Sequence, residues 1–331
     1  MDRESQLIER IARGIPSEAK GSLCLGIGDD AAILAPNDRN EWALSCDAFL
    51  EGVHFLTKIH PPDSVGYKSL VRATSDLVAM GATPRMFLLT LALPASRTGK
   101  WLNDFIRGMK RAARSLGVSL AGGDTSKSSA VSISVTVLGE VAPGHALKRT
   151  GARPGDIVYV SGRLGRAQLG LELILRGLHH RPSLKRFAQP HLYPRIRVEL
   201  GAWLAQRRVA SAMMDISDGL STDLTRMIAA SRVGARLWSK SIPCATVPLT
   251  RSKKLASLEL DPLRLALHGG DDYGLLFTVP ARKVKRLRKA PGYSELTAIG
   301  EITRGRQVLL VDANGCVKHL DPQGWDPFKE K

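Results

Sequence analysis

Apolar residues recur along this chain at two spacings, three to four residues apart as in amphipathic helices and two apart as in half-buried strands. The helical spacing predicts helices over residues 5–15, 65–80, 101–116, 166–175 and 195–206, and another over 220–228. Asp63 is placed to cap the second of these helices. The buried stripe of the third is expected to consist of Leu102, Phe105, Ile106 and Met109.

Shorter apolar or alternating runs predict strands. They lie at residues 23–25, 31–34, 42–45, 86–93, 131–141, 157–161, 275–279, 297–302 and 308–311. In the fifth of these runs, Val131, Ile133, Val135 and Val137 fall on one face, as expected for a strand that is buried on one side. The segment 179–193 is expected to be a basic loop.

The turn-forming segment Ala142-Pro143-Gly144-His145 divides this pattern into two halves. A chain of 331 residues is long enough for two domains with ordinary cores. We therefore expect an N-terminal domain at residues 1–142 and a C-terminal domain at 146–331, each a mixture of helices and strands. Both halves carry aspartate-bearing turns.

The overall composition is that of a soluble globular protein, with 44% hydrophobic and 24% charged residues. No apolar run approaches the ~20 residues of a membrane span. The first residues carry mixed charge and lack a signal-peptide pattern, which predicts a cytoplasmic protein. Four scattered cysteines, Cys24, Cys46, Cys244 and Cys316, form no CxxC pair, and this argues against a zinc site or a disulfide framework.

A net charge of +17 admits nucleic acid as a partner. The densest basic stretch, 282–289, has Val284 and Leu287 three residues apart and is expected to form a surface helix. The few aromatic residues do not interleave with this stretch as stacking platforms for bases would. We interpret the charge mainly as solvated surface that attracts anions, and RNA binding is the less favoured alternative.

Aspartate recurs beside glycine or serine in six short segments, most of them at the ends of apolar runs. These segments are Gly26-Ile27-Gly28-Asp29-Asp30, Ser45-Cys46-Asp47, Ser75-Asp76, Gly122-Gly123-Asp124-Thr125, Asp215-Ile216-Ser217-Asp218-Gly219 and Gly269-Gly270-Asp271-Asp272. Any one of them alone is an ordinary turn or helix cap. Their recurrence in a cationic chain suits Mg²⁺, which takes oxygen ligands and can bridge to phosphate.

Several other interpretations fit less well. The first segment matches G-x-G-x-x-A, but Asp29 and Asp30 would repel a pyrophosphate at that turn. No segment has the spacing of a calcium-binding loop, and the low aromatic content disfavours a glycosidase. A P-loop and the H-R-D and D-F-G motifs of protein kinases are absent from the sequence. A phosphoryl-transfer enzyme of this sequence would therefore be of neither common kind.

Taken in order, the six segments resemble thiamine-monophosphate kinase, a family within the superfamily of aminoimidazole ribonucleotide synthetase and selenophosphate synthetase. Further matching segments are Gly52-Val53-His54-Phe55, Arg149-Thr150-Gly151-Ala152, Pro154-Gly155-Asp156 and Gly324-Trp325-Asp326-Pro327-Phe328. The resemblance implies an N-terminal α/β domain that dimerises through its sheet and binds ATP and Mg²⁺. It also implies a C-terminal α+β domain that completes the nucleotide and substrate site, with ATP held near the interface of a homodimer.

The resemblance also implies a function and a set of site residues. The expected reaction is the ATP-dependent phosphorylation of thiamine monophosphate to thiamine diphosphate by direct in-line transfer, assisted by several Mg²⁺ ions and without a dedicated general base. Positions that match magnesium ligands are Asp30, Ser45, Cys46, Asp47, Asp76, Asp124, Asp215 and Asp218. Positions that match ATP contacts are Gly123, Asp124, Arg149 and Ser217. Positions that match thiamine monophosphate contacts are His54, Asp271 and Trp325, the last by stacking on the cationic ring.

The sequence departs from the family pattern at four positions. Cys46 stands where threonine is usual, Asp271 where glutamate is usual, Ala73 where asparagine is common and Pro327 where histidine is common. A thiol is a poor Mg²⁺ ligand, so only the backbone carbonyl at position 46 could coordinate. These departures bear on substrate affinity more than on the type of reaction.

Plainer interpretations remain open for single residues and for the whole chain. His54 could be a core or surface histidine, Arg149 a surface charge, and Trp325 a packing anchor for the tail. The chain could also be another enzyme of the superfamily, or a catalytically weak protein that binds nucleotide or RNA. Selenophosphate synthetase is disfavoured because no cysteine precedes Cys24.

Overall fold

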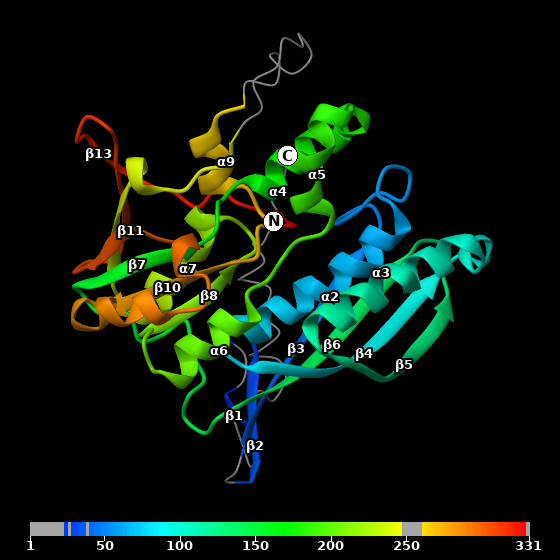
Figure 1. Ribbon diagram of the computed structural model, residues 1–331, viewed down its shortest axis with the longest axis horizontal. Helices are drawn as coiled ribbons and strands as arrows, with labels where there is room; N and C mark the ends of the chain where they lie inside the picture. Colours follow the sequence, from blue (N-terminus) through cyan, green and yellow to red (C-terminus); the bar gives the residue numbers. More distant parts are fainter. Residues whose placement is uncertain (1–22, 26–27, 38–39, 247–259, 329–331) are drawn as a thin grey trace. The chain divides into compact units, whose positions relative to one another are not determined.

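The computed structural model describes residues 23–25, 28–37, 40–246 and 260–328 (Figure 1). The predicted helix 5–15 lies outside the described residues. The described chain forms two compact units. Unit 1 contains the described residues up to Lys148 together with 326–328, and unit 2 contains Arg149–Trp325 without the undescribed segment 247–259. Each unit combines helices with one sheet and has its own core.

Unit 1 is built on a six-stranded sheet with the order β1-β2-β3-β6-β4-β5. Its strands are β1 (Leu23–Leu25), β2 (Ala32–Asn37), β3 (Asn40–Leu50), β4 (Thr83–Leu93), β5 (Ser119–Lys127) and β6 (Ser132–Val141). Neighbouring strands are antiparallel except for β4 and β5, which are parallel. Alternate residues of β6 are buried, including Ile133, Val135 and Val137 as predicted.

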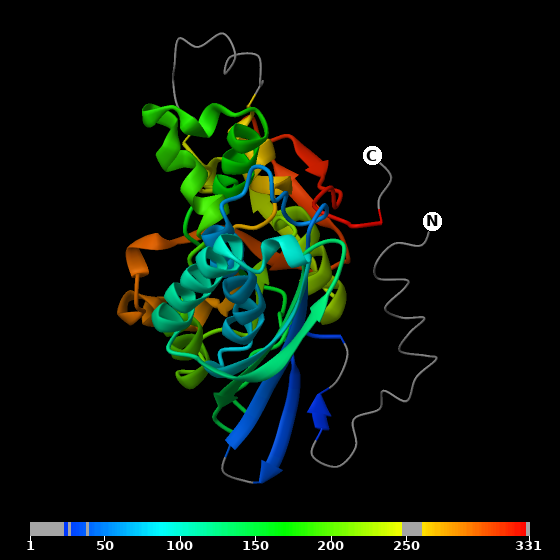
Figure 2. The ribbon, with the colours of Figure 1, turned by 90° about the vertical axis from the view of Figure 1, so that its right-hand side faces the viewer.

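Two helices, α2 (Pro62–Ala79) and α3 (Lys100–Leu116), lie on the same face of this sheet, and the short helix η1 (Ala95–Arg97) precedes α3 (Figures 1 and 2). The helices approach closely at two glycines. A Cβ atom at Gly66 would lie 2.1 Å from the Phe105 carbonyl oxygen, and one at Gly108 would lie 1.8 Å from the Asp63 carbonyl oxygen. Glycine is therefore required at both contacts, since no side chain fits there.

The predicted cap of α2 is wrong. The helix begins at Pro62 with Pro61 as its N-cap residue, and Asp63 lies in the first turn. Proline is favoured at the first helical position because its missing N–H would have no intrahelical partner there. Asp63 still suits this position, since a carboxylate in the first turn interacts favourably with the helix dipole.

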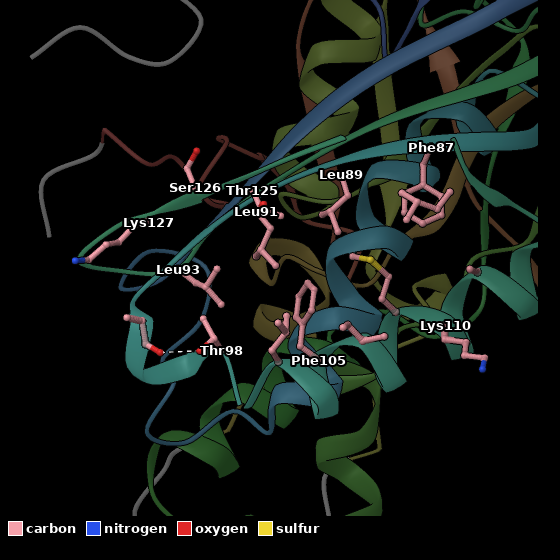
Figure 3. A pocket seen from close by; sticks show the side chains of 16 residues that line it. Phe87, Leu89, Leu91, Leu93, Thr98, Phe105, Lys110, Thr125, Ser126 and Lys127 are labelled. Atoms are coloured by element: carbon pink, nitrogen blue, oxygen red, sulfur yellow. Dashed lines mark hydrogen bonds between the residues drawn. The ribbon is translucent and has the colours of Figure 1, made fainter. Parts of the chain in front are cut away.

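The predicted buried stripe of α3 is wrong at Ile106, which is 50% exposed, and Leu102 is only half-buried. The buried residues are Phe105, Gly108, Met109 and Ala112, a stripe that uses a glycine and an alanine at the helix contact. Ile106 instead lines an apolar cavity of about 820 Å³ between α3 and the strands β4 and β5 (Figure 3). The hydrophobic pattern could not reveal this rotation because Gly108 does not register as an apolar position.

Unit 2 is built on a seven-stranded sheet with the order β13-β12-β9-β11-β7-β10-β8. Its strands are β7 (Asp156–Ser161), β8 (Ala212–Ile216), β9 (Gly234–Trp238), β10 (Gly274–Pro280), β11 (Leu296–Thr303), β12 (Val308–Val311) and β13 (Val317–His319). Only β9 and β12 are parallel neighbours. The sequence patterns did not predict β8, β9 or β13. The first two are short and mostly buried, so they show no alternation.

Unit 2 contains the following helices. They are α4 (Arg166–Leu175), α5 (Pro182–Leu192), α6 (Val198–Gln206), α7 (Leu220–Ser231) and α9 (Pro262–His268), with short helices η2 (Leu178–His180), η3 (Ser239–Ser241), η4 (Ala281–Lys289) and η5 (Tyr293–Glu295). α7 packs Leu220, Leu224 and Met227 into the core of unit 2. The basic stretch 282–289 is helical as expected, but as the 3-10 helix η4 with Leu287 buried.

The expectation of a basic loop at 179–193 is wrong, because α5 occupies most of it. Its buried residues Leu184, Ala188, His191 and Leu192 follow helical spacing. Pro182 occupies the first helical turn and Pro190 lies inside the helix, and these prolines hid the pattern. Among the helices that the structure describes, none has the length and apolarity needed to cross a membrane.

Candidate functional site

Unit 1 brings two of the predicted metal-binding aspartates together. Asp30 lies just before β2 and Asp76 lies in α2, and their carboxylate oxygens are within 4.8 Å of one another. Asp30 is only 8% exposed. The Ser45 hydroxyl on β3 donates a hydrogen bond of 2.5 Å to Asp76 Oδ2. Two carboxylates this close repel each other, and a hard cation with oxygen ligands, such as Mg²⁺, would relieve the repulsion.

The alternation of β3 decides which of its side chains join this pair. Ser45 and Asp47 lie on the face toward α2, whereas Cys46 lies on the opposite face. The Cys46 Sγ atom is 3.4 Å from Ser134 Oγ and 3.2 Å from Thr136 Oγ1, both on β6. The Cys46 side chain is therefore not part of the Asp30–Asp76 pair, and only its backbone could serve that site.

Asp47 has a cationic partner that the sequence did not point to. Arg72 Nε on α2 lies 2.8 Å from Asp47 Oδ2, and the Arg72 guanidinium carbon is 5.4 Å from the centre of the Phe49 ring. Its position four residues before Asp76 places Arg72 on the same side of α2. This spacing of four residues from Asp76 is the one sequence feature that could have indicated that Arg72 lies near the site. Arg72 adds a positive charge beside the acidic pair, which suits the binding of phosphate.

Gly123 and Asp124 lie within the edge strand β5 rather than in a turn at the end of a run. A Cβ atom at Gly123 would lie 1.8 Å from the Leu89 carbonyl oxygen of β4, so only glycine allows the two strands to approach here. Asp124 is exposed, and Ser126 Oγ is 3.5 Å from its carboxylate. In the part of the chain that the structure describes, Asp124 is not grouped with Asp30 and Asp76.

His54 lies in the turn that follows β3. Its Nδ1 atom accepts a hydrogen bond of 3.0 Å from the Leu50 backbone N–H, and its ring stacks on Phe49 at 5.6 Å. Because Nδ1 is an acceptor, the proton of the neutral ring is on Nε2. His54 therefore presents a fixed N–H donor, which is the group needed to contact a phosphate or a heteroatom of a substrate.

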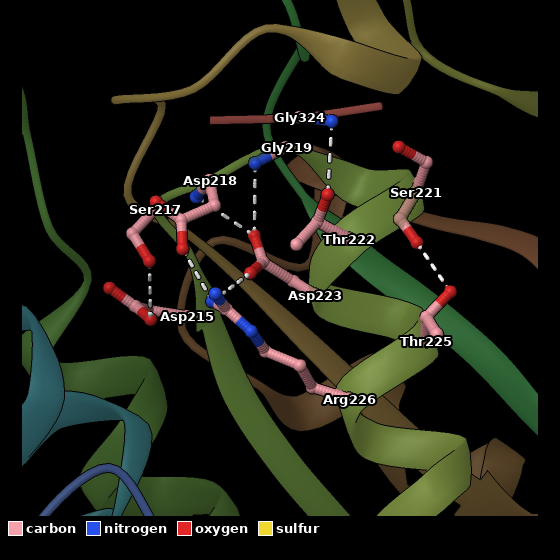
Figure 4. Close-up of polar contacts among 10 residues, drawn as sticks. All are labelled: Asp215, Ser217, Asp218, Gly219, Ser221, Thr222, Asp223, Thr225, Arg226 and Gly324. Atoms are coloured by element: carbon pink, nitrogen blue, oxygen red, sulfur yellow. Dashed lines mark hydrogen bonds and ion pairs between the residues drawn. The ribbon is translucent and has the colours of Figure 1, made fainter. Parts of the chain in front are cut away.

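Unit 2 gathers a second group of acidic residues in the segment 215–219, which we call the acidic turn (Figure 4). Asp215 is the next-to-last residue of the buried strand β8 and is 2% exposed, and Ser217 Oγ is 3.5 Å from its carboxylate. Arg226 on α7 forms an ion pair with Asp218. The turn thus presents two carboxylates and a hydroxyl at the start of α7.

Asp223 holds the backbone of the acidic turn by hydrogen bonds. It is fully buried and accepts hydrogen bonds of 3.1 Å from the backbone N–H groups of Asp218 and Gly219, while Arg226 Nη1 lies 3.3 Å away. Burial raises the pKa of Asp223 well above its usual value, and the nearby Asp218 carboxylate raises it further. An Asp in the first turn after a glycine is a common helix-start signal, and the sequence could have indicated this role.

Three successive carbonyl groups of the acidic turn hold segments that are distant in sequence. The Ile216 oxygen accepts from the Tyr273 N–H at 2.8 Å, and the Ser217 oxygen accepts from the Asp271 N–H at 2.7 Å. The Asp218 oxygen accepts from the Trp325 N–H at 2.9 Å. Five residues predicted for metal, nucleotide and substrate binding therefore lie on one short frame. They are Asp215, Ser217, Asp218, Asp271 and Trp325.

Trp325 is held by its backbone, not by its ring. A Cβ atom at Gly324 would lie 1.9 Å from the Asp218 carbonyl oxygen, so the tail packs tightly at that glycine. The Trp325 side chain remains 42% exposed and lines a polar cavity of about 440 Å³ together with Gly269 and Gly270. The indole thus has exposed surface beside this cavity.

Asp272 and Asp271 point to different partners. Asp272 is partly buried as a residue, and its carboxylate accepts hydrogen bonds from the backbone N–H groups of Gly165 and Ala167, the latter at 2.9 Å. Burial raises the pKa of Asp272 from 3.8 to about 7, against the lowering effect of these two hydrogen bonds. Asp271 is a non-glycine residue with a φ of 67°, and its carboxylate stays partly exposed.

The backbone of Arg149 lies at the opposite end of α7 from the acidic turn. Its carbonyl oxygen accepts a hydrogen bond of 2.9 Å from Ser231, the last residue of α7. The acidic turn precedes the first residue of that helix, and 12 helical residues span about 18 Å. Any contribution of Arg149 to a nucleotide site would have to come through its long side chain.

Comparisons with known proteins identify the family of this chain. Residues 28–141 match the AIR synthase related protein, N-terminal domain, and residues 153–312 match the AIR synthase related protein, C-terminal domain. The thiamine-monophosphate kinase of Escherichia coli (strain K12) is 36% identical, and the alignment covers 92% of each chain. The thiamine-monophosphate kinase of Buchnera aphidicola subsp. Schizaphis graminum is 34% identical over 94% of each chain.

Solved structures give the same result. AaThiL complexed with AMPPCP and TMP superposes with a TM-score of 0.84 and 33% sequence identity, covering 98% of this chain and 97% of that one. E. coli HypE, a hydrogenase maturation protein, has a TM-score of 0.68 at 20% identity and shares the fold alone. The predicted two-domain fold class and the family resemblance are thereby confirmed. This chain belongs to the thiamine-monophosphate kinase family, with the two domains of the AIR synthase related proteins.

Proposed function

We propose that this protein transfers the γ-phosphoryl group of ATP to thiamine monophosphate and forms thiamine diphosphate. The observation that carries the proposal is the acidic turn, whose consecutive carbonyl groups hold Asp271 and Trp325 beside Asp215 and Asp218. The carboxylates proposed to handle phosphate and the indole proposed to bind an organic cation are thus held by the same short segment. The related AaThiL was solved with AMPPCP, an ATP analogue, and TMP, which supports this pair of substrates.

The oxygen-rich side chains of both units suit Mg²⁺, because carboxylates and hydroxyls are its preferred protein ligands. We propose Asp30, Ser45, Asp47 and Asp76 in unit 1, with Asp124 and the Cys46 backbone, as residues that hold such ions. Asp215 and Asp218 would do so in unit 2. When bound, several Mg²⁺ ions would neutralise the charge of the transferred and acceptor phosphates.

The protein groups then have defined tasks. Gly123, Asp124, Arg149 and Ser217 would contact the nucleotide, and Arg72 and Arg226 would fix the carboxylates of Asp47 and Asp218. His54 and Asp271 would contact thiamine monophosphate. The acceptor is a phosphate oxygen that is already anionic, so the transfer requires alignment in line with the leaving group and no general base.

A direct assay tests the proposal. Purified protein with ATP, Mg²⁺ and thiamine monophosphate is expected to form thiamine diphosphate and ADP in equal amounts. Thiamine, which lacks the acceptor phosphate, serves as the control substrate and should not be phosphorylated at a comparable rate. Absence of thiamine diphosphate with a folded protein that binds ATP would reject the proposed reaction.

Trp325 gives the first test of substrate recognition. Trp325→Ala is expected to raise the KM for thiamine monophosphate about tenfold, because loss of a partly desolvated cation–π contact costs about 1–2 kcal/mol. Trp325→Phe keeps an aromatic face and should have a smaller effect. Steady-state titrations of both substrates provide the measurement. Equal weakening of ATP and thiamine monophosphate would show that Trp325 orders the tail instead.

The N-terminal sheet supports a proposal of homodimerisation. β5 is an edge strand whose nine residues are all exposed, and Leu120 on it is 58% exposed. Leu88 on the neighbouring β4 is 41% exposed. An open, partly apolar edge of this kind is normally covered in the native protein. Sedimentation at micromolar concentration is expected to give a dimer, and a fully active monomer would contradict this.

A further inference from the structure

We propose that Tyr273 and His191 are positioning residues that fix the carboxylate of Asp271 for the binding of thiamine monophosphate. This inference rests on the proposed function and extends it to two residues outside the predicted site. Tyr273 follows Asp271 by two positions in the same turn, whereas His191 comes from α5, a helix that the sequence did not predict. We call these two residues and Asp271 the Asp271 clamp.

The backbone of this turn is held in an unusual conformation. Asp271 and Tyr273 have φ angles of 67° and 48°, in the left-handed region that non-glycine residues rarely adopt. Their N–H groups are bonded to the carbonyl oxygens of Ser217 and Ile216 at 2.7 and 2.8 Å. Asp272, between them, is anchored in the opposite direction on the start of α4. Strain of this kind persists where the surroundings determine it, and it concentrates at functional sites.

The side chains complete the clamp. The Tyr273 hydroxyl donates a hydrogen bond of 2.7 Å to Asp271 Oδ1, and Tyr273 is 3% exposed. His191 Nδ1 lies 3.8 Å from Asp271 Oδ2, and the His191 side chain is also 3% exposed. The Asp271 side chain is 32% exposed. Two buried groups thus approach one oxygen each, and the carboxylate between them remains accessible to a ligand.

This arrangement matters because Asp271 is shorter than the glutamate that is usual at its position in the family. A glutamate can adjust its reach through an additional rotatable bond, whereas an aspartate must be placed correctly by its surroundings. A phenol that donates to Oδ1 fixes the rotation of the carboxylate and leaves acceptor capacity for a substrate N–H or cation. The clamp therefore fixes the orientation of a short carboxylate that stays partly exposed to a ligand.

A double-mutant cycle tests the inference. Tyr273→Phe removes only the hydroxyl, and it is expected to raise the KM for thiamine monophosphate about fivefold, with kcat and the KM for ATP within twofold of wild type. His191→Gln should raise the same KM about twofold to threefold. In an Asp271→Asn background, neither substitution should add to the effect of Asp271→Asn, because both act through that carboxylate.

Tyr159→Phe is the matched control. Tyr159 is also buried in unit 2, at 9% exposed, and it stacks on Phe277 in the sheet. Its loss of a hydroxyl should leave both KM values unchanged. An effect of Tyr273→Phe that persists in the Asp271→Asn background, or equal losses for both substrates, would overturn the clamp. So would a result for Tyr273→Phe that is no larger than for Tyr159→Phe.

Equilibrium binding separates this inference from the proposed reaction. Calorimetric titration of thiamine monophosphate into the same variants reports the clamp without turnover. A wild type that binds thiamine monophosphate but forms no diphosphate would reject the reaction, and the binding series would still decide on the clamp. A wild type that does not bind thiamine monophosphate would overturn both.

Discussion

Replacing Asp76 by asparagine is expected to lower kcat by about 10²-fold or more while the fold stays intact. Asp76 forms an acidic pair with Asp30, and the Ser45 hydroxyl orients the Asp76 carboxylate by a hydrogen bond. An amide keeps nearly the same shape but removes the negative charge that would hold a cation against the phosphates. Loss of one such charge in an electrostatic site typically costs 10²–10³ in rate.

Asp63→Asn is the matched control for this prediction. It makes the same chemical change in the same helix, at the first turn, where Arg111 Nη2 lies 3.8 Å from Asp63 Oδ2. Activity should change by less than twofold in that variant. Circular dichroism and thermal unfolding establish that both variants are folded. A folded Asp76→Asn enzyme with near-normal kcat at saturating Mg²⁺ would remove Asp76 from the proposed metal-binding set.

The acidic turn holds two segments that are distant in sequence at fixed positions beside it. Its backbone carbonyls hold the turn of Asp271 and the tail at Trp325, and we propose that its side chains serve the phosphate chemistry. Hydrogen bonds between backbone groups fix positions that side-chain contacts alone would leave adjustable. Glycines at 270 and 324 allow the close approach, since a Cβ atom would lie 2.7 and 1.9 Å from carbonyl oxygens of the turn.

The helices and strands with clear periodicity were predictable from the sequence. The helix α4 and the strand β12 have the predicted bounds, and β6 buries the predicted face. The pattern failed where packing, not hydrophobicity, decides the outcome. Gly108 sets the buried side of α3, and burial on both faces removes alternation from β8.

The candidate site was predictable as a set of aspartates but not as a structure. Arg226 carries no motif, and only the folded chain shows that it pairs with an acidic residue of the turn. The same is true of His191, which α5 brings to within 3.8 Å of Asp271. Contacts between residues far apart in sequence depend on the packing of whole elements, which spacing within one segment does not report.

The stability of this protein is expected to fall between pH 5 and pH 8 through the titration of Asp272. Burial raises its pKa from 3.8 to about 7, so the folded state keeps a proton that the unfolded state has already released at pH 5. The unfolded state therefore binds fewer protons in this window, and the free energy of unfolding decreases as the pH rises. The stabilisation is complete below about pH 4 and is lost as the pH passes through 7.

Asp272→Asn isolates this contribution. A difference of about two pKa units above pH 5 corresponds to about 2–3 kcal/mol, so wild type should lose that much stability relative to the variant between pH 5 and pH 8. The variant also replaces one acceptor oxygen of the hydrogen bonds to Gly165 and Ala167 by a donor, which lowers its stability by a constant amount at every pH. Urea unfolding at pH 5, 6, 7 and 8 provides the measurement. Asp321→Asn, at an exposed position, is the control and should follow wild type. A difference in stability between wild type and Asp272→Asn that stays constant over this range would show that Asp272 is already ionised in the folded protein at pH 5.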